Sequence, residues 1–381
     1  MAIRLAILGL ELIQREWLEA VETLRAAGEI ELVAIGHRSL ASAREVAAVF
    51  KSAGGAGAAG GGGGGAGGMP PTFDDLRLML KEAAPQVVLM DRPVNATLEF
   101  LLACVAQGIA ILSLGPPVES LAEAQALSGP LGSRTHLLYT WPRFSDAPAA
   151  RQCAEADEFA RPIRFASATW TGMNYALAKA LPAETGAAAA ATGGWGPARD
   201  AGAALPVRSL SVLAWDAIDT LIHLMEMPHS VYAVVRGTVG SGNSFGDLTG
   251  AAALTLRFAD DAAAGITLCD RTVSSTRDLM LWGAGGTLRL QTQGYEFRDA
   301  DGKLIDAKEI RDAAASASSQ TGRGQAEAAL REFLRHFAMP PSPHRGWKNR
   351  LEEIAATLEA MVVSHRTGQA ESPERLRHLR R

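Results

Sequence analysis

The size and charge of the chain limit the classes of protein to which it can belong. Its 381 residues are too many for one ordinary domain and suit two. The net charge of −4, from 37 basic and 41 acidic residues, gives no general attraction to nucleic acid or to anionic membranes. The 3 cysteines match no zinc spacing and no apolar run is long enough to cross a bilayer. We therefore expect a cytoplasmic protein with no metal site, no nucleic-acid partner and no membrane contact.

The first part of the chain alternates between strand-like and helical patterns. Continuous β-branched runs predict buried strands, and apolar residues at helical spacing predict amphipathic helices. The expected strands are 3–9, 30–35, 87–90, 109–114 and 136–139, and the expected helices are 12–27, 42–50, 76–83, 95–107 and 118–127. This alternation predicts an α/β domain over residues 1–140, a Rossmann-type doubly wound parallel sheet. Within it, residues 54–68 are nearly all Gly and Ala, which predicts a flexible insertion.

The remaining residues, 141–381, predict a second domain of α+β type. The expected strands are 163–171, 230–239, 251–258, 265–270, 278–282, 287–291 and 295–297. Strands that follow one another with turns between them favour an open, mostly antiparallel sheet. One long helix, residues 213–227, lies among them, residues 182–204 form a second Gly/Ala-rich loop, and helices 325–338 and 348–367 close the chain.

The turn after the first strand is where a dinucleotide-binding protein carries three glycines. Gly9 stands at the first position, but Glu11 and Gln14 stand at the second and third. A side chain at the second position blocks close approach of a pyrophosphate, and a carboxylate repels it. Gly9 is therefore interpreted in two ways, as part of a nucleotide site or simply as a tight strand–helix turn.

Seven short segments, in this order and spacing, carry a resemblance to a known family. They are residues 30–35, 107–112, 143–144, 216–219, 285–288, 331–334 and 365–368. Together they resemble the glucose–fructose oxidoreductase/inositol dehydrogenase/MocA (Gfo/Idh/MocA) family. The resemblance implies hydride transfer between NAD(H) or NADP(H) and a carbon of a sugar or cyclitol. It also implies that the second domain binds the small-molecule substrate and builds homo- or hetero-oligomers through its sheet.

The resemblance assigns cofactor contacts to Gly9, Arg38, Ser39 and Pro93. The pair Arg38-Ser39, just after the second strand, resembles that of NADP-preferring members, in which arginine neutralises a 2′-phosphate. NADP(H) is therefore expected in preference to NAD(H). The alternative is that both residues merely begin an exposed helix.

The family's catalytic positions are replaced in this chain. Gly115 stands where the family has its lysine, and Asp216 where it has its histidine. Asp216 and Asp219 share one helix face, so they form either an acid/base pair or a locally hydrogen-bonded structural pair. Tyr175 and Lys179 form a Tyr-x-x-x-Lys pair in a segment that lines the family's cleft. These four residues are the candidates for proton transfer.

Two functions stay open at this point. The first is an NAD(P)-type oxidoreductase that acts on a sugar-like or polyol substrate with non-standard catalytic residues. The second is a catalytically inactive relative that serves as a binding, regulatory or scaffold subunit. The second hypothesis depends on the simultaneous replacement of the family's lysine, histidine, first aspartate and two glycines.

Overall fold

In the computed structural model, most of the chain is described and divides into two compact units. The described residues are 2–52, 69–91, 98–132, 138–140, 162–173, 209–239, 242, 244–291, 294–309, 321–338 and 350–379. Both Gly/Ala-rich segments, residues 54–68 and 182–204, lie outside them. Among the helices in these residues, none is long and apolar enough to span a membrane.

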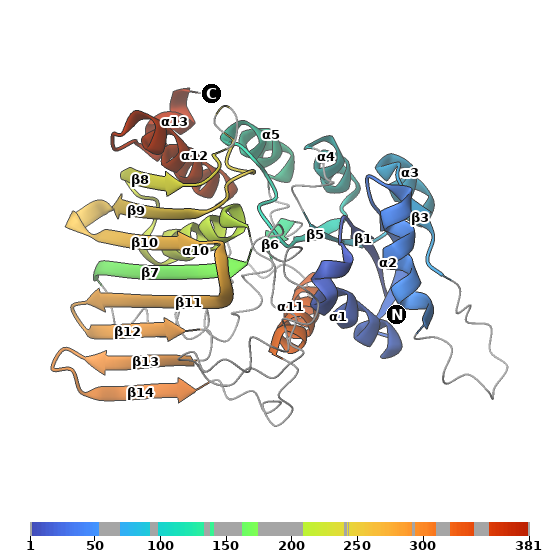
Figure 1. Cartoon of the computed structure of the whole chain (residues 1–381), viewed down its shortest axis with the longest axis horizontal. Helices are drawn as coiled ribbons and strands as arrows, with labels where there is room; N and C mark the ends of the chain where they lie inside the picture. Colours follow the sequence, from blue (N-terminus) through green and yellow to red (C-terminus); the bar gives the residue numbers. More distant parts are fainter. Residues whose placement is uncertain are drawn as a thin grey trace. The chain divides into compact units, whose positions relative to one another are not determined.

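The first unit is built on a six-stranded, fully parallel sheet (Figure 1). Its strands are β1 (Ile3–Leu8), β2 (Ile30–Gly36), β3 (Thr72–Phe73), β4 (Val87–Met90), β5 (Ala110–Ser113) and β6 (Leu138–Thr140). The helices of this unit that connect them are α1 (Arg15–Ala26), α2 (Leu40–Ser52), α3 (Leu76–Ala83) and α4 (Leu98–Gln107), whereas α5 (Leu121–Leu131) follows β5 in the chain but belongs mostly to the second unit. The order β3-β2-β1-β4-β5-β6 is that of a Rossmann sheet, which confirms the predicted fold class. Strand β3 was not expected, because its two residues are too short to produce a pattern.

Helix α11 (Thr321–Ala338) belongs to this first unit although it lies near the end of the chain. Its apolar stripe enters the core formed by β1, α1 and their neighbours. The buried residues of that stripe are Ala326, Ala329, Leu330, Phe333 and Leu334. On the exposed side, Arg331 forms an ion pair with Glu29 at 2.9 Å. The compact units are discontinuous in sequence, since α11 belongs to the first unit and residues 118–128 belong to the second.

The second unit contains an eight-stranded sheet in the order β14-β13-β12-β11-β7-β10-β9-β8. Its strands are β7 (Ile163–Met173), β8 (Ser230–Arg236), β9 (Ala251–Arg257), β10 (Ala263–Cys269), β11 (Arg271–Gly283), β12 (Gly286–Gln291), β13 (Gly294–Asp299) and β14 (Leu304–Glu309). Only β7 and β10 pair in parallel among these neighbours, and every other pair is antiparallel. The open, mostly antiparallel sheet is thus confirmed, and β14 is an additional strand.

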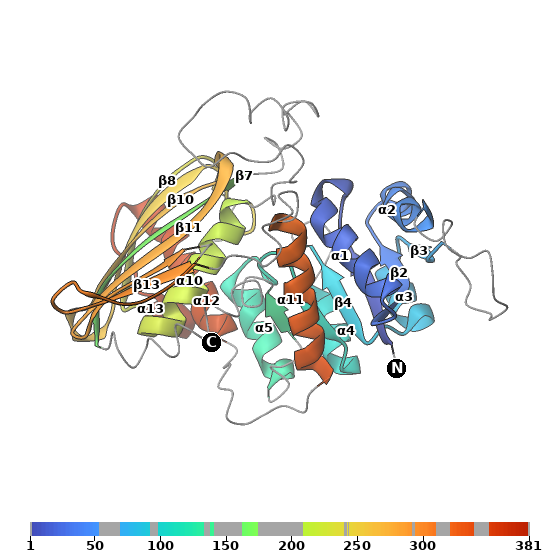
Figure 2. The ribbon, with the colours of Figure 1, turned by 90° about the horizontal axis from the view of Figure 1, so that it is seen from below.

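Two helices cover one face and one edge of this sheet (Figure 2). Helix α10 (Leu210–Met225), the long helix predicted from the sequence, packs on β7 and β10. Helix α12 (Leu351–Thr367) lies against β8, and α13 (Pro373–Leu379) follows it. The Oγ atom of Ser364 accepts a hydrogen bond from the Ala233 N–H at 3.0 Å, so α12 shields an otherwise open strand edge.

Candidate functional site

The turn after β1 requires a glycine at its first position. Gly9 has a φ of +74°, in the left-handed region that favours glycine. Its N–H donates to the Gly36 carbonyl at 2.9 Å, which ties the end of β1 to the end of β2. Gly9 therefore has a structural role whether or not a nucleotide lies beside it.

The next residues close the turn on themselves. Residues Leu12–Gln14 form a short 3-10 helix that begins with a capping box between Glu11 and Gln14. The Gln14 Oε1 atom accepts from the Glu11 N–H at 2.9 Å, and its Nε2 atom donates to Asp91 Oδ2 at 2.7 Å. Gln14 is 4% exposed and Asp91 5%, so this polar pair is buried. Sequence reasoning missed Asp91, although a polar residue immediately after the buried strand β4 was a signal.

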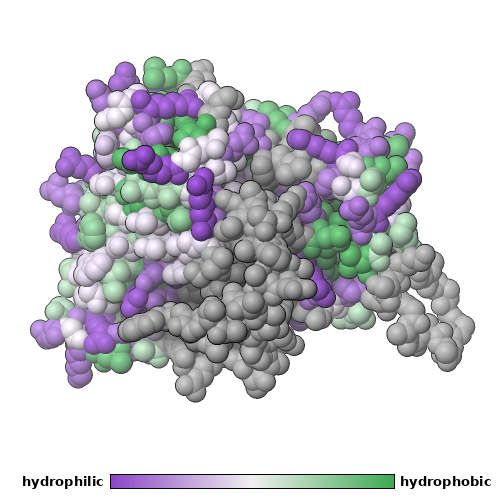
Figure 3. Space-filling model, in the orientation of Figure 1, coloured by the Kyte–Doolittle hydropathy of each residue, from purple (hydrophilic) through white to green (hydrophobic). Residues whose placement is uncertain are grey.

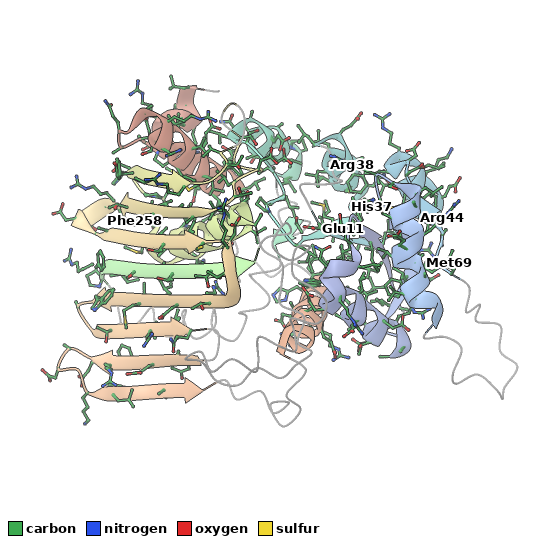
Figure 4. All side chains as sticks on the ribbon, viewed as in Figure 1. Glu11, His37, Arg38, Arg44, Met69 and Phe258 are labelled. Atoms are coloured by element: carbon green, nitrogen blue, oxygen red, sulfur yellow. The ribbon has the colours of Figure 1, made fainter. Side chains whose placement is uncertain are left out.

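The segment after β2 carries the predicted cofactor residues Arg38 and Ser39, both exposed. His37 precedes them and is only 6% exposed. Its Nδ1 atom accepts from the Ser39 N–H at 3.2 Å, and burial lowers the pKa of the imidazole below its usual value. The neutral ring then carries its proton on Nε2, a buried atom with no hydrogen-bond partner among the described residues. Figure 4 shows Glu11, His37 and Arg38 gathered in the same part of this unit.

In the second unit, Asp216 is held within a buried polar network. Its Oδ2 atom accepts from Trp170 Nε1 at 2.8 Å, and its Oδ1 atom from Arg277 Nη2 at 3.1 Å. The same Arg277 nitrogen donates to Thr220 Oγ1 at 3.0 Å, and the guanidinium lies 5.3 Å from the centre of the Trp170 ring. Burial lowers the pKa of Arg277 to about 10, which leaves the guanidinium charged at neutral pH. Both carboxylate oxygens of Asp216 are therefore engaged.

The other predicted catalytic positions give less information. Asp219 lies on the same helix and is 7% exposed. Gly115 supplies no side chain, and its carbonyl accepts from the buried Ser113 hydroxyl at 2.8 Å. Tyr175, Lys179 and Pro93 lie outside the described residues. Within those residues, no group of three or more His, Cys, Asp or Glu side chains is placed to hold a metal ion.

A second buried carboxylate, Asp270, secures the start of α10 and was missed from the sequence. Asp270 is 0% exposed, and its oxygens accept from the Leu210 N–H at 3.0 Å and the Gly250 N–H at 2.9 Å. These bonds satisfy a helix N-terminus and the loop before β9. Asp270 thus helps to position the helix that carries Asp216 and Asp219.

Comparison with known proteins adds the class of fold. No family model and no curated protein matches the sequence. Among solved structures, an oxidoreductase from Agrobacterium radiobacter in complex with NAD+, L-tartaric acid and magnesium has a TM-score of 0.67 at 13% identity, covering 99% of this chain and 100% of its own. A levoglucosan dehydrogenase in complex with NADH and L-sorbose has a TM-score of 0.66 at 14% identity, covering 98% and 99%. A putative myo-inositol dehydrogenase from Sinorhizobium meliloti has a TM-score of 0.62 at 16% identity, covering 97% and 99%.

These similarities identify the fold over nearly the whole chain. The protein has the two-unit fold of NAD(P)-dependent sugar and polyol oxidoreductases. More narrowly, its structural neighbours are Gfo/Idh/MocA-type oxidoreductases, which agrees with the resemblance seen in the sequence.

Proposed function

We propose that the protein is an NAD(P)-type oxidoreductase that acts on a sugar-like or polyol substrate through non-standard catalytic residues. The observation that carries this proposal is the fold, shared over nearly the whole chain with levoglucosan and myo-inositol dehydrogenases. The first unit is assigned to the nucleotide. The second unit is assigned to binding of the small-molecule substrate. Asp219, Tyr175 and Lys179 are the candidates for proton transfer, and Asp216 is a charged neighbour of Asp219.

NADP(H) is proposed in preference to NAD(H) because of the residues that follow β2. The Arg38 guanidinium and the Ser39 hydroxyl suit a 2′-phosphate, which needs a charge and hydrogen-bond donors. Gly9 and Pro93 complete the proposed contacts. Glu11 and Gln14 do not fit the pyrophosphate of the same cofactor.

Replacing Arg38 with alanine tests the cofactor assignment. We expect the Kd for NADPH to rise by about tenfold or more, since hydrogen bonds to charged groups contribute about 1.5–3 kcal/mol. NADH has no 2′-phosphate, so its Kd is expected to stay unchanged. Isothermal titration calorimetry measures both values. Arg44→Ala, at an exposed position on α2, is the matched control. Equal losses for NADPH and NADH would contradict the assignment.

The buried network around Asp216 favours a second candidate function. At the position of the family's histidine stands a carboxylate held by Trp170 and Arg277, and Gly115 has no side chain at the position of the lysine. A catalytically inactive binding, regulatory or scaffold subunit fits these replacements. Assays of a polyol panel with NADP+ and NAD+, followed by nicotinamide absorbance, separate the two functions. Turnover supports the first, whereas ligand binding without turnover supports the second.

The face of the second sheet that no helix of the described residues covers is proposed as an interface with a second copy of this chain. Phe165 and Trp282 are directly opposed across β7 and β11, with ring centres 5.3 Å apart and side chains 43% and 37% exposed. Tyr232 and Val234 on β8 are exposed on the same face. Between them lie mostly small residues, and Figure 3 shows pale and green residues over these strands. Exposed aromatic residues among small, uncharged ones are typical of an interface.

Replacing Trp282 with glutamate is expected to dissociate this oligomer. Burying an unpaired carboxylate in an apolar interface costs several kcal/mol, so the dissociation constant is expected to rise by about a hundredfold. Sedimentation velocity measures the change. Leu78→Glu, at an exposed position on α3 of the first unit, is the control and leaves the oligomer intact. A monomeric wild-type protein would contradict the proposed interface.

A further inference from the structure

Gln14 forms hydrogen bonds within the turn that a pyrophosphate would otherwise contact. The Glu11 N–H lies at the start of the first helical turn, where a backbone N–H normally binds a phosphate oxygen. In this chain that N–H is bonded to Gln14 Oε1 at 2.9 Å. The backbone N–H of Gln14 is also engaged, since it donates to the Glu11 carbonyl at 2.9 Å. Both of these N–H groups are therefore bonded to residues of the turn itself.

The other end of the Gln14 amide is bonded to a carboxylate, that of Asp91. Its Nε2 atom donates to Asp91 Oδ2 at 2.7 Å. Asp91 directly follows β4, and its backbone N–H donates to the Leu8 carbonyl at 3.0 Å, so it stands beside the end of β1. At 5% exposure, this carboxylate is buried against Gln14, the residue at the third glycine position.

Two further carboxylates belong to the same strand–helix connection. Glu11 is the N-cap of the 3-10 helix, and Glu16 lies in the first turn of α1. Acidic side chains are favourable near a helix N-terminus because they complement its partial positive charge. The chain thus supplies its own negative charges where dinucleotide-binding proteins leave room for a diphosphate.

We infer that the pair Gln14–Asp91 closes this turn to pyrophosphate, so that a nucleotide on this unit is held by its adenosine 2′-phosphate end. The second clause rests on the proposed function, because it needs the contacts of Arg38 and Ser39. The closure itself rests only on the buried hydrogen bonds. Adenosine 2′-monophosphate, which has no pyrophosphate, is the ligand class that fits the residues present.

The experiment compares NADPH with adenosine 2′-monophosphate by calorimetry on the full chain. With a closed turn, wild-type protein binds the two ligands within about threefold of one another, since the pyrophosphate gains no contact. The double variant Glu11→Gly/Gln14→Gly restores the glycines, and we expect its Kd for NADPH to fall by about tenfold or more. Its Kd for adenosine 2′-monophosphate is expected to stay within about twofold of the wild-type value.

Gln86→Gly is the matched control. Gln86 directly precedes β4, whereas Asp91 directly follows it. The Gln86 Oε1 atom accepts from the Arg4 N–H at 3.0 Å. Losing that hydrogen bond is expected to leave the binding of both ligands unchanged.

A second variant keeps the test decisive if the double variant does not fold. Asp91→Asn retains a partner for Gln14 and removes the charge, so it is expected to improve NADPH binding by about threefold or more. Wild-type protein that binds NADPH tenfold or more tightly than adenosine 2′-monophosphate would overturn the closure, as would folded variants that gain nothing. If wild-type protein binds neither ligand, the proposed cofactor fails, and the NADPH gain of the variants still decides the closure.

Discussion

Replacing Arg277 with methionine is expected to lower the free energy of unfolding by about 3–5 kcal/mol, the usual cost of removing one partner from a buried ion pair. Arg277 and Asp216 are 16% and 5% exposed and lie 3.1 Å apart. The variant leaves a buried carboxylate without the positive charge that offsets its desolvation. Chemical denaturation, followed by tryptophan fluorescence and circular dichroism, measures the change.

The same sheet offers a matched control for this prediction. Arg289 on β12 pairs with Asp278 on β11, but these side chains are 42% and 28% exposed. Solvent screens such a pair, so Arg289→Met is expected to cost about 1 kcal/mol or less. A double variant, Asp216→Leu with Arg277→Met, removes both charges and is expected to recover part of the loss. Equal effects of Arg277→Met and Arg289→Met would show that Asp216 does not depend on its partner.

The functional meaning of this network follows from its burial. A general acid or base must reach the substrate proton, and its carboxylate must be able to change partners. The two oxygens of Asp216 already accept from Trp170 and Arg277, and Thr220 binds the same guanidinium. A strong loss of stability on breaking the pair would assign Asp216 a positioning role on α10. Proton transfer would then fall to Asp219, Tyr175 or Lys179, or to none of them in an inactive relative.

Replacing Phe333 with alanine is expected to destabilise the first unit by about 3–5 kcal/mol, because a large buried ring leaves a cavity. Phe333 is 0% exposed and lies on α11, within the core that contains Leu5, Trp17 and Val21. Hydrogen exchange with mass spectrometry localises the effect. We expect amides of β1 and α1 to lose protection while those of β7 to β14 keep theirs, since each unit has its own core.

Phe337 provides the control on the same helix. It is only partly buried at the edge of that core, so Phe337→Ala is expected to cost about 1–2 kcal/mol. If Phe333→Ala changed protection in the second unit instead, α11 would not be part of the first core in solution.

Local sequence patterns predicted most of the secondary structure. Strands that alternate with helices predicted the parallel sheet of the first unit, and consecutive strands predicted the mostly antiparallel sheet of the second. Weak patterns failed where the elements are short or exposed. Strand β3 has two residues, and β14 exposes Leu304 and Ile305 instead of alternating. Asp75 caps α3, since its Oδ1 atom accepts from the Arg77 and Leu78 N–H groups.

The candidate site was predicted as residue positions, without the contacts that give them meaning. Arg38, Ser39 and Asp216 stood out because a family resemblance assigns roles to those positions. His37 and Asp91 did not, because a single buried polar residue has no recognisable pattern. Their importance appears only when the ends of β1, β2 and β4 are placed next to one another.

Residue patterns alone were enough to predict the fold class of each half of the chain, because strand and helix periodicity depend on residues within a few positions of one another. The sequence also shows which familiar groups are missing, since Glu11, Gln14, Gly115 and Asp216 are visible as letters. The tertiary structure decided what replaced them. Gln14 and Asp91 are 77 residues apart, and Asp216 and Arg277 are 61. Strand order and burial bring such partners together, and only then do a closed turn and a buried ion pair exist.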